Sequence, residues 1–487
     1  MFTIAGHVVR HLDQRAVNGV RVSIAMVKDP QREVSVVSGE NGEFSFQGVP
    51  AGKYRLSVTE RGLSQLYQET EGSYSTAIVT GAGQDTEHIV FPLHAPASLS
   101  GSVVDEENDP VPEATVYLFA QSLRAGKDQI RIGGQGATDT AGEFHFRRLP
   151  PGTYYVAVAG RPWYAQNMPP GGGAPGKPNS DLDVAYPVTY YLGVTSAESA
   201  TPIKLEEGTR AEVEFTLHAV PAVHLSMEAQ EEGRQRRGIG VTQVGPGGVS
   251  IHLPVIQTPT ELLGLAPGNY VVDSQAVSVV GDASLRASGG LKTSIKGKVI
   301  LNGEAPNGWM VALRNTREEV WGSEVVHADG SFEIPAASAG RYFLALMNVP
   351  DIYLAKVDVK GAAYRDGELE IAPGAQVELL LTQRHGLTKL EGVVVEDKKP
   401  LSGAMVLLIP QDPHHGKTIA RDQSDGDGTF AMEGVAPGRY TLVAIDNGLG
   451  LAYADAAVIA PYLERGRALD VPVGGDAKVE IEVQRRP

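Results

Sequence analysis

The side chains most able to do chemistry in this 487-residue chain are its 12 histidines and its 58 aspartates and glutamates. Zinc hydrolysis needs a His-Glu-x-x-His helix or another convergence of histidines and carboxylates, and no such run occurs. The sequence also lacks Gly-x-Ser-x-Gly, the turn that carries the nucleophile of α/β hydrolases. With no cysteine, it has no thiol nucleophile, thiolate metal site or disulfide. We therefore expect no catalytic residue, no metal site and no cofactor, and predict that the protein is not an enzyme.

The histidines are spread along the chain. His7, His145 and His224 lie within alternating strand patterns, where a structural or surface role is typical. His414 and His415 are adjacent in a loop, and adjacent residues of an extended chain face opposite sides. We expect neither group to bind a metal ion.

One acidic run and one glycine run come closer to known ligand sites. Residues 422–428 read Asp-Gln-Ser-Asp-Gly-Asp-Gly and could offer carboxylates to Ca²⁺. The run lacks the spacing and the terminal glutamate of a calcium loop, so we favour a solvated turn. Residues 171–173 are three glycines in a proline-rich stretch with no Lys-Ser pair, which indicates a flexible loop rather than a phosphate site.

The candidate binding residues lie in a stretch rich in proline and glycine, residues 161–191. It has six prolines and four glycines in 31 residues, together with five aromatic side chains: Trp163, Tyr164, Tyr186, Tyr190 and Tyr191. Aromatic faces on a proline-shaped loop can stack on sugar rings or anchor a protein partner. The alternative is that these rings pack over the end of their own domain. Packing is favoured because most aromatic side chains are at least partly buried.

Three short motifs recur along the chain and define a repeat. An apolar strand that contains glycine opens the units, at Gly6, Gly101, Gly297 and Gly392. A tight turn followed by x-Phe comes next, with Phe44, Phe144, Phe332 and Phe430. Pro-Gly-x-Tyr or a weaker form follows, with Tyr54, Tyr154, Tyr270, Tyr342 and Tyr440. These turns tolerate the positive φ of a hairpin, and alternating apolar residues after them predict strands.

The opening glycines set the repeat length. Gly6 and Gly101 are 95 residues apart, as are Gly297 and Gly392, whereas Gly101 and Gly297 are 196 residues apart, which is two lengths of 98. A degenerate unit therefore lies between them. Short strands at this spacing require two packed antiparallel sheets per unit.

We thus predict an all-β tandem array of about five Ig-like or prealbumin-like antiparallel β-sandwich domains. The expected domains are 1–95, 96–218 with the insert at 161–191, 219–293 in degenerate form, 294–385 and 386–487. Further tyrosines after the same turn predict an equivalent extra hairpin in the first and fifth domains: Tyr67, Tyr74, Tyr453 and Tyr462. Short proline-containing links such as residues 94–97 favour a semi-rigid rod.

Together these motifs resemble the carboxypeptidase regulatory-like domain, a transthyretin-like sandwich also grouped with the carbohydrate-binding-like fold. The match is good in the first, second and fifth units, partial in the fourth and weak in the third. The chain is also similar to multi-domain proteins of acidobacterial genomes, whose function is not established, through its tyrosine-rich residues 186–191. The resemblance implies a fold rather than a reaction, because this domain is an accessory in zinc carboxypeptidases.

Charge and hydropathy limit the classes of partner that the protein can bind. The net charge of −16 opposes extended contact with the phosphates of nucleic acid. No apolar run of the sequence approaches 18 residues, so we expect no membrane-spanning helix. Residues 1–6 lack the regions of a signal peptide, but the resemblance implies an extracellular or cell-envelope location. We expect a non-catalytic spacer or adhesion scaffold whose partners are glycans or envelope proteins. The alternative is an array of carbohydrate-binding modules that uses the aromatic loops of the second domain.

Overall fold

Alternating apolar residues form strands along the whole chain, as in β9 (Ala97–Val104), where every second side chain is buried. The structure is a computed structural model. It describes residues 1–71, 74–166, 181–227, 240–258, 261–272, 275–285, 294–301, 309–315, 320–334, 340–347, 351–365, 367–372, 374–411, 419–448 and 450–486. The protein is an all-β array of tandem sandwiches, as predicted. Its sheets fall into five groups along the chain, here called units 1 to 5.

The bounds of the elements follow the chain. Unit 1 contains β1 (Phe2–Arg10), β2 (Arg21–Met26), β3 (Asp29–Val37), β4 (Glu43–Val49), β5 (Gly52–Glu60), β6 (Leu63–Leu66), β7 (Ile78–Thr80) and β8 (Ile89–Leu93). Unit 2 contains β9, β10 (Thr115–Arg124), β11 (Lys127–Ala137), β12 (Glu143–Leu149), β13 (Gly152–Ala159), β14 (Val184–Ala185), β15 (Thr189–Tyr190), η1 (Ala197–Ser199), β16 (Ile203–Leu205), β17 (Arg210–Thr216) and β18 (Val220–Pro221).

The remaining units are built in the same way. Unit 3 contains β19 (Val223–Met227), β20 (Val241–Val244), η2 (Pro246–Gly248), β21 (Ser250–His252), β22 (Ile256–Gln257), β23 (Glu261–Leu265), β24 (Gly268–Val272), β25 (Gln275–Val279) and β26 (Ala283–Leu285). Unit 4 contains β27 (Ser294–Leu301), β28 (Met310–Asn315), β29 (Val320–Val325), β30 (Ser331–Ile334), β31 (Gly340–Met347), β32 (Ile352–Lys360), β33 (Ala363–Arg365), β34 (Glu368–Ile371) and β35 (Gln376–His385). Unit 5 contains β36 (Thr388–Glu396), β37 (Lys399–Pro400), β38 (Met405–Pro410), β39 (Ala420–Gln423), β40 (Thr429–Val435), β41 (Gly438–Ile445), α1 (Ala456–Leu463), β42 (Arg467–Val471) and β43 (Gly475–Gln484).

One strand arrangement recurs in all five units. The opening strand pairs antiparallel with the strand that carries the phenylalanine motif or its equivalent, and parallel with a strand near the end of the unit. Each opening strand also contributes at least one fully buried residue to the core of its own unit: Ile4, Leu99, Leu225, Ile295 and Leu390. We propose the predicted boundaries at 95, 218, 293 and 385 as the domain limits, although β18 pairs back with β14 of unit 2.

The glycine and phenylalanine motifs are partners across this sheet. Gly101 pairs with Phe144, and Gly392 pairs with Phe430. A Cβ atom added to Gly101 would lie 2.7 Å from the ring carbon Cζ of Phe144, and one added to Gly392 would lie 2.4 Å from Cζ of Phe430. Ordinary contact between carbon atoms needs about 3.5 to 4.0 Å. The glycine is therefore required because the aromatic ring and a carbonyl of the parallel neighbouring strand, Val213 O or Val479 O, both crowd its Cα.

Unit 3 shows what happens when the pair is lost. The opening strand of unit 3 pairs with equivalent strands on both sides. The pair of Leu225 and Leu262 in unit 3 corresponds to the pair of Ile4 and Phe46 in unit 1. Two residues further on, Met227 stands in place of the glycine. The sheet thus persists without either motif residue, which explains why the sequence signal for unit 3 is weak.

The tyrosine motif fixes the turn before it. The hydroxyl of Tyr54 donates to Pro50 O at 3.1 Å, that of Tyr154 to Pro150 O at 2.6 Å and that of Tyr440 to Ala436 O at 2.8 Å. Tyr270 of unit 3 makes the same bond to Ala266 O. The motif survives in the degenerate unit because the buried hydroxyl satisfies a turn carbonyl.

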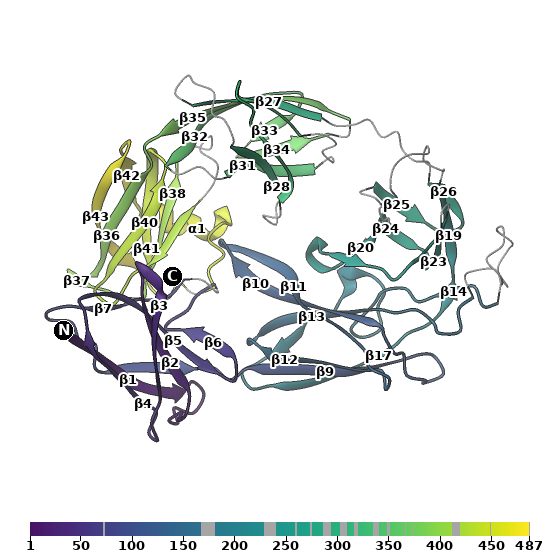
Figure 1. The fold of residues 1–487 in the computed structure, drawn as a ribbon, viewed down its shortest axis with the longest axis horizontal. Helices are drawn as coiled ribbons and strands as arrows, with labels where there is room; N and C mark the ends of the chain where they lie inside the picture. Colours follow the sequence, from purple (N-terminus) through teal and green to yellow (C-terminus); the bar gives the residue numbers. More distant parts are fainter. Residues whose placement is uncertain are drawn as a thin grey trace.

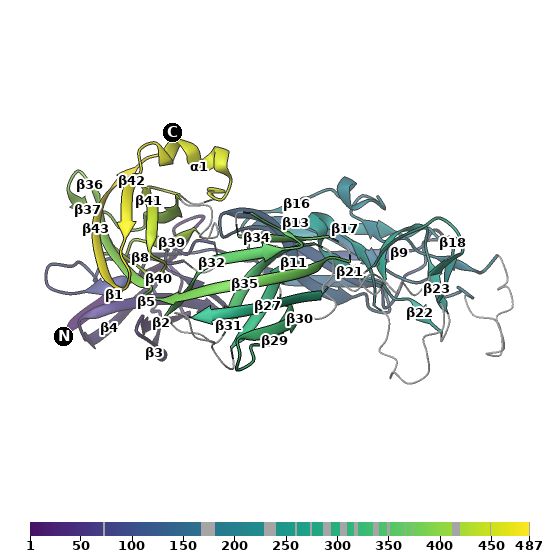
Figure 2. The ribbon, with the colours of Figure 1, turned by 90° about the horizontal axis from the view of Figure 1, so that it is seen from above.

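The five units do not form a rod. They follow one another around a closed loop in which unit 5 contacts unit 1 (Figure 1). Seen from above, units 1 and 5 lie at one end of the molecule and unit 3 at the other (Figure 2). The expected semi-rigid rod is therefore wrong, because side chains of the two terminal units are complementary and bring them together.

A long hairpin of unit 2 reaches toward the other units inside this loop (Figure 1). Its strands, β10 and β11, have 10 and 11 residues, whereas the equivalent β38 and β39 of unit 5 have six and four. At its tip, Gly126 O accepts a hydrogen bond from Ala454 N of unit 5 at 3.1 Å. Lys127 Nζ lies 5.9 Å from the centre of the Phe343 ring in unit 4. The hairpin thus touches units that are far away in sequence.

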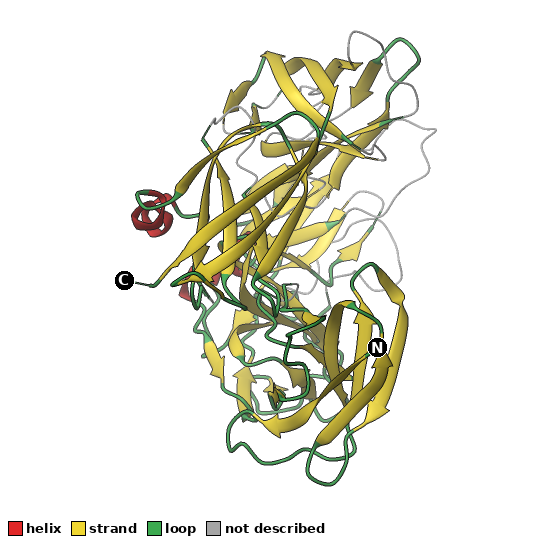
Figure 3. Ribbon diagram, turned by 90° about the vertical axis from the view of Figure 1, so that its left-hand side faces the viewer, coloured by secondary structure: helices red, strands yellow, loops and turns green. Residues whose placement is uncertain are grey.

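Strands make up nearly all of the regular structure (Figure 3). Unit 5 differs from the prediction, because Tyr453 and Tyr462 accompany the helix α1 rather than an extra hairpin. Asp455 caps this helix by accepting a hydrogen bond from Ala457 N. Among the described residues, no helix is long and apolar enough to cross a membrane.

Candidate functional site

The aromatic residues of the unit 2 insert divide into a buried group and an exposed ring. Tyr190 is fully buried between units 2 and 3, in a cluster with Tyr117, Phe119 and Ile251. Tyr186 is buried in the core of unit 2, and Tyr191 packs against it from the edge. Neither Tyr186 nor Tyr190 offers a face to a ligand, because neighbouring side chains cover both rings.

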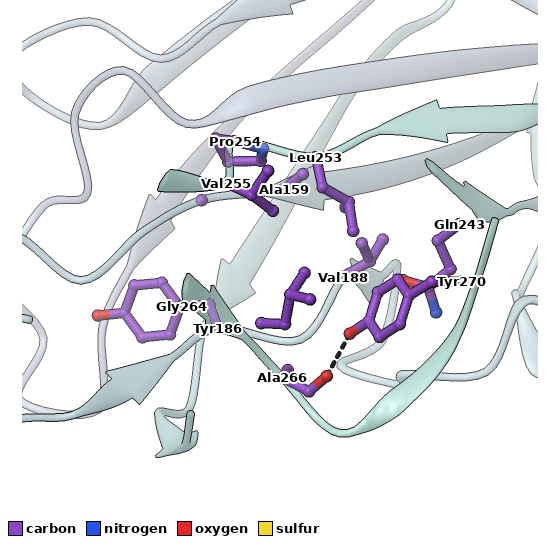
Figure 4. A pocket seen from close by; sticks show the side chains of 12 residues that line it. Ala159, Tyr186, Val188, Gln243, Leu253, Pro254, Val255, Gly264, Ala266 and Tyr270 are labelled. Carbon is purple, nitrogen blue, oxygen red and sulfur yellow. Dashed lines mark hydrogen bonds between the residues drawn. The ribbon is translucent and has the colours of Figure 1, made fainter. Parts of the chain in front are cut away.

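Tyr186 also borders a small cavity between units 2 and 3 (Figure 4). The cavity has a volume of about 20 Å³, enough for roughly one water molecule. Val188, Leu253 and Tyr270 are among its lining side chains. Burial, with the nearby Tyr164 and Glu106, raises the pKa of Tyr186, so its hydroxyl stays neutral. This cavity is too small for a sugar.

Trp163 is the exposed member of the group. This residue is 75% exposed, and its ring meets that of Tyr164 edge-on with ring centres 5.7 Å apart. The Tyr164 hydroxyl donates to Glu106 Oε1 at 2.8 Å, and burial together with this bond raises its pKa to about 12. The bond fixes Tyr164, which in turn supports the open ring of Trp163.

A buried ionic contact closes the loop between units 5 and 1. The Arg421 guanidinium is paired with Glu71, and their side chains are 2% and 6% exposed. The rings of Tyr74 and Tyr453 lie 4.3 and 5.6 Å from the guanidinium carbon. Such positions favour cation–π attraction. Unit 1 thus supplies the carboxylate and one ring, and unit 5 supplies the cation and the other ring.

Uncharged groups complete this contact. Arg421 Nη2 donates to the Thr70 hydroxyl at 2.8 Å, and that hydroxyl donates to Gln423 Oε1 at 2.9 Å. The Gln423 side-chain amide donates to Gln68 O at 2.9 Å and to the Thr76 hydroxyl at 2.8 Å. Buried hydrogen bonds of this kind fix one register between two surfaces.

The acidic run at 422–428 belongs to the same contact. Asp422 accepts from Ala431 N at 2.7 Å, and Asp425 accepts from Lys53 Nζ at 2.5 Å and from Ala77 N at 3.0 Å. Desolvation raises the pKa of Asp422 to about 6 and also raises that of Asp425. These carboxylates bind protein groups of their own and the neighbouring unit and are largely removed from solvent, so the expectation of a solvated turn is wrong for Asp422 and Asp425.

A cleft lies beside the closing contact, with a volume of about 500 Å³. Its lining carries charges of both signs: Lys53, Glu391, Asp427, Lys478 and Glu480. Such a surface suits a small polar ligand better than a stacked sugar ring, since aromatic faces are the usual sugar platform.

The predicted histidines have separate surroundings. His7 is exposed and lies 3.3 Å from Asn41 O, and His145 lies 3.8 Å from Glu143. His224 Nε2 lies 3.0 Å from Asp183 Oδ1, which joins units 3 and 2. The pair at 414–415 and the glycine run at 171–173 lie outside the described residues. The sequence did not single out Arg421 and Glu71, because they are 350 residues apart and belong to no motif.

Comparison with known proteins bears on the fold and the family. No curated protein matches the chain. Among solved structures, the Bacillus anthracis TIE protein is 12% identical over 99% of this chain and 74% of that chain, with a TM-score of 0.18. The minor pilin GBS52 of Streptococcus agalactiae is 12% identical over 48% of this chain and 100% of that chain, with a TM-score of 0.24. Two B repeat units of the collagen binding protein of Staphylococcus aureus are 13% identical over 92% and 93%, with a TM-score of 0.15.

Similarity at this level carries no functional argument. The family assignment depends instead on the sequence model of the carboxypeptidase regulatory-like domain, which matches residues 3–93 and 98–185. These segments hold the opening glycines, the Gly–Phe pairs and the tyrosine turns of units 1 and 2. The chain therefore contains two carboxypeptidase regulatory-like domains in tandem, in units 1 and 2.

Proposed function

We propose that the protein is a non-catalytic interaction scaffold of the cell envelope or exterior, in which five sandwiches are held in a closed arrangement. The observation that carries this proposal is the buried contact of Arg421 with Glu71 between the last and first units. A buried ion pair contributes little net stability, but a wrong register of the two surfaces would leave a buried charge without its partner, which is costly. A simple spacer needs no such contact between its ends. The location is inferred from the domain type.

The titratable groups support a structural role. Asp422 and Asp425 have raised pKa values, which are common at catalytic sites. Here their oxygens accept hydrogen bonds from backbone N–H groups and Lys53. Their burial thus serves the contact between units.

Distance measurements in solution test the closed arrangement. The chain has no cysteine, so Gln31→Cys in unit 1 and Arg465→Cys in unit 5 can be spin-labelled without background. Both positions are exposed. We expect one narrow distance distribution in the parent and a broad one after Arg421→Ala. A broad distribution in the parent chain would refute the closed scaffold.

Carbohydrate binding is the second candidate, and the exposure of Trp163 beside Tyr164 favours it. Stacking on an exposed indole is a common way to hold a sugar ring. A glycan array should then give a signal that Trp163→Ala abolishes. Leu192→Ala is the matched control, because Leu192 is 64% exposed in the same unit and offers no aromatic face. Equal signals from the parent and Trp163→Ala would exclude Trp163 as the platform.

A further inference from the structure

Two histidines and one glutamate meet where unit 1 joins unit 2. His11 follows β1 and His94 follows β8, and these parallel strands pair Arg10 with Leu93. Neighbouring strands are about 4.8 Å apart. The register therefore places the two histidines side by side, and their ring centres are 4.2 Å apart.

Unit 2 supplies the third group. Glu207 lies in the turn between β16 and β17. Its Oε2 atom is 3.0 Å from His11 Nδ1 and 3.1 Å from His94 Nδ1. In the part of the chain that the structure describes, these residues are the one group of three or more histidines and carboxylates whose ligand atoms all lie within 4.8 Å of one another.

We propose that His11, His94 and Glu207 bind a divalent first-row transition metal ion, Zn²⁺ above all, which fixes unit 1 against unit 2. Two imidazole nitrogens and one carboxylate oxygen are a common protein ligand set for zinc, with the fourth position left to water or another ligand. Zinc lies about 2.0 to 2.1 Å from such ligands, so tetrahedral ligand atoms are about 3.3 Å apart. The observed 3.0 and 3.1 Å need only small side-chain rotations to reach this spacing.

Surrounding bonds hold the ligands in place. Glu207 Oε1 accepts from Ala95 N at 2.7 Å, which orients the carboxylate and leaves Oε2 for the ion. The Gln65 side chain donates to His94 O at 2.7 Å and accepts from His94 N at 3.0 Å. His11 N donates to Leu93 O at 3.0 Å. The backbone of each histidine is thus fixed before any ion binds.

Access and charge also suit a cation. The side chains of His11 and His94 are 49% and 45% exposed, so an ion can enter, whereas that of Glu207 is 8% exposed. Arg10, the cation that directly precedes His11, forms two hydrogen bonds with Glu60 at 3.0 and 2.9 Å. Its charge is therefore compensated, and the carboxylate remains available.

The proposal replaces the expectation of no metal site. His11 and His94 are 83 positions apart in the sequence, and His94 and Glu207 are 113 positions apart. No local sequence motif therefore indicates this site. Each lies next to a strand end whose pairing is visible only in the structure.

Zinc titration against a chromophoric chelator tests the proposal with the untagged full chain. His414→Gln and His415→Gln are introduced first as a common background, so that this adjacent pair cannot contribute. We expect one Zn²⁺ per chain. His11→Gln, His94→Gln and Glu207→Gln should each weaken binding at least tenfold. The matched control is His7→Gln, which changes an exposed histidine on β1, the strand that His11 follows.

Two further measurements distinguish the loss of a metal ligand from a defect in folding. Bound Co²⁺ should show the intense visible absorption of a four-coordinate ion in the background protein and lose it in His11→Gln. Zinc should raise the Tm of the background protein and leave that of His94→Gln unchanged, because only a bound ion adds stability. Equal zinc affinity in the background protein and the three ligand variants would overturn the proposal, as would no binding at all.

Discussion

Two contacts between units use opposite chemistry. The contact of units 2 and 3 is mainly apolar, with Tyr117, Phe119, Tyr190 and Ile251 buried together. The pair of His224 and Asp183 also joins these two units. The contact of units 5 and 1 centres on the ion pair of Arg421 and Glu71, which is also buried. The first joins neighbours along the chain, and the second joins its two ends.

The difference follows from chain connectivity. Units 2 and 3 are tethered by a few residues, so a non-directional apolar patch is enough to keep them together. Units 5 and 1 must find each other across the intervening units. Hydrogen bonds and charges are directional, and a wrong register would leave Arg421 buried without a partner. The polar contact therefore selects one closed arrangement, while the apolar contact tolerates variation.

Removing one partner of the ion pair should have the largest effect. Arg421→Ala leaves Glu71 buried without its cation, which costs about 3 to 5 kcal/mol. We expect the contact of units 5 and 1 to open and the radius of gyration in small-angle X-ray scattering to rise. The apolar contact of units 2 and 3 should persist.

A double variant separates charge from packing. Arg421→Met with Glu71→Leu replaces the pair by apolar side chains, which is often neutral or stabilising. It should restore most of the compactness that Arg421→Ala loses. If Arg421→Ala alone scatters like the parent, the ion pair does not hold the ends together.

Units 1, 2, 4 and 5 could be recognised from the sequence for a physical reason. A glycine and a phenylalanine face each other across two strands and depend on each other sterically, so the same pair recurs at a similar spacing in these units. Gly101 with Phe144 and Gly392 with Phe430 are such pairs. In unit 3 Met227 replaces the glycine, and only Tyr270 with its bond to Ala266 O marks the unit.

The contacts between units could not be predicted in this way. The sequence singled out Tyr74 and Tyr453 as additional aromatic residues. It did not show that both contact Arg421, because Tyr74 is in unit 1 and Arg421 is in unit 5. Glu207 faces two histidines that are 83 residues apart from each other. These contacts depend on how whole units are placed relative to one another. The periodic sequence pattern within a unit contains no information about that placement.

A truncation in the apolar contact should have an intermediate effect. Ile251→Ala removes a fully buried side chain and leaves a cavity between units 2 and 3, at a cost of about 2 to 3 kcal/mol. We expect hydrogen exchange to increase in β10 and β21 while the amides of β39 stay protected. Val244→Ala is the control, since Val244 is 51% exposed in the same unit. A closed loop that opens as in Arg421→Ala would contradict the independence of the two contacts.

The smallest effect concerns Asp422, beside the polar contact. Desolvation raises its pKa in the folded protein from 3.8 to about 6, so the folded state holds the proton more tightly than the unfolded state. Its ionisation therefore destabilises the fold as pH rises through about 6, and this penalty is absent below about pH 4. After allowance for solvent screening, we expect a penalty of about 1 to 2 kcal/mol at pH 7.

Asp422→Asn should remove this penalty, because the amide oxygen can still accept the Ala431 N–H bond. Hydrogen exchange of the β39 amides in increasing urea should show the variant to be more stable than the parent at pH 7 and nearly equal to it at pH 4. Asp13→Asn, an exposed carboxylate of unit 1, should show no such difference. A constant gap between Asp422→Asn and the parent from pH 4 to 7 would mean that packing, not ionisation, governs this position. The polar contact would then resemble the apolar one in its indifference to pH.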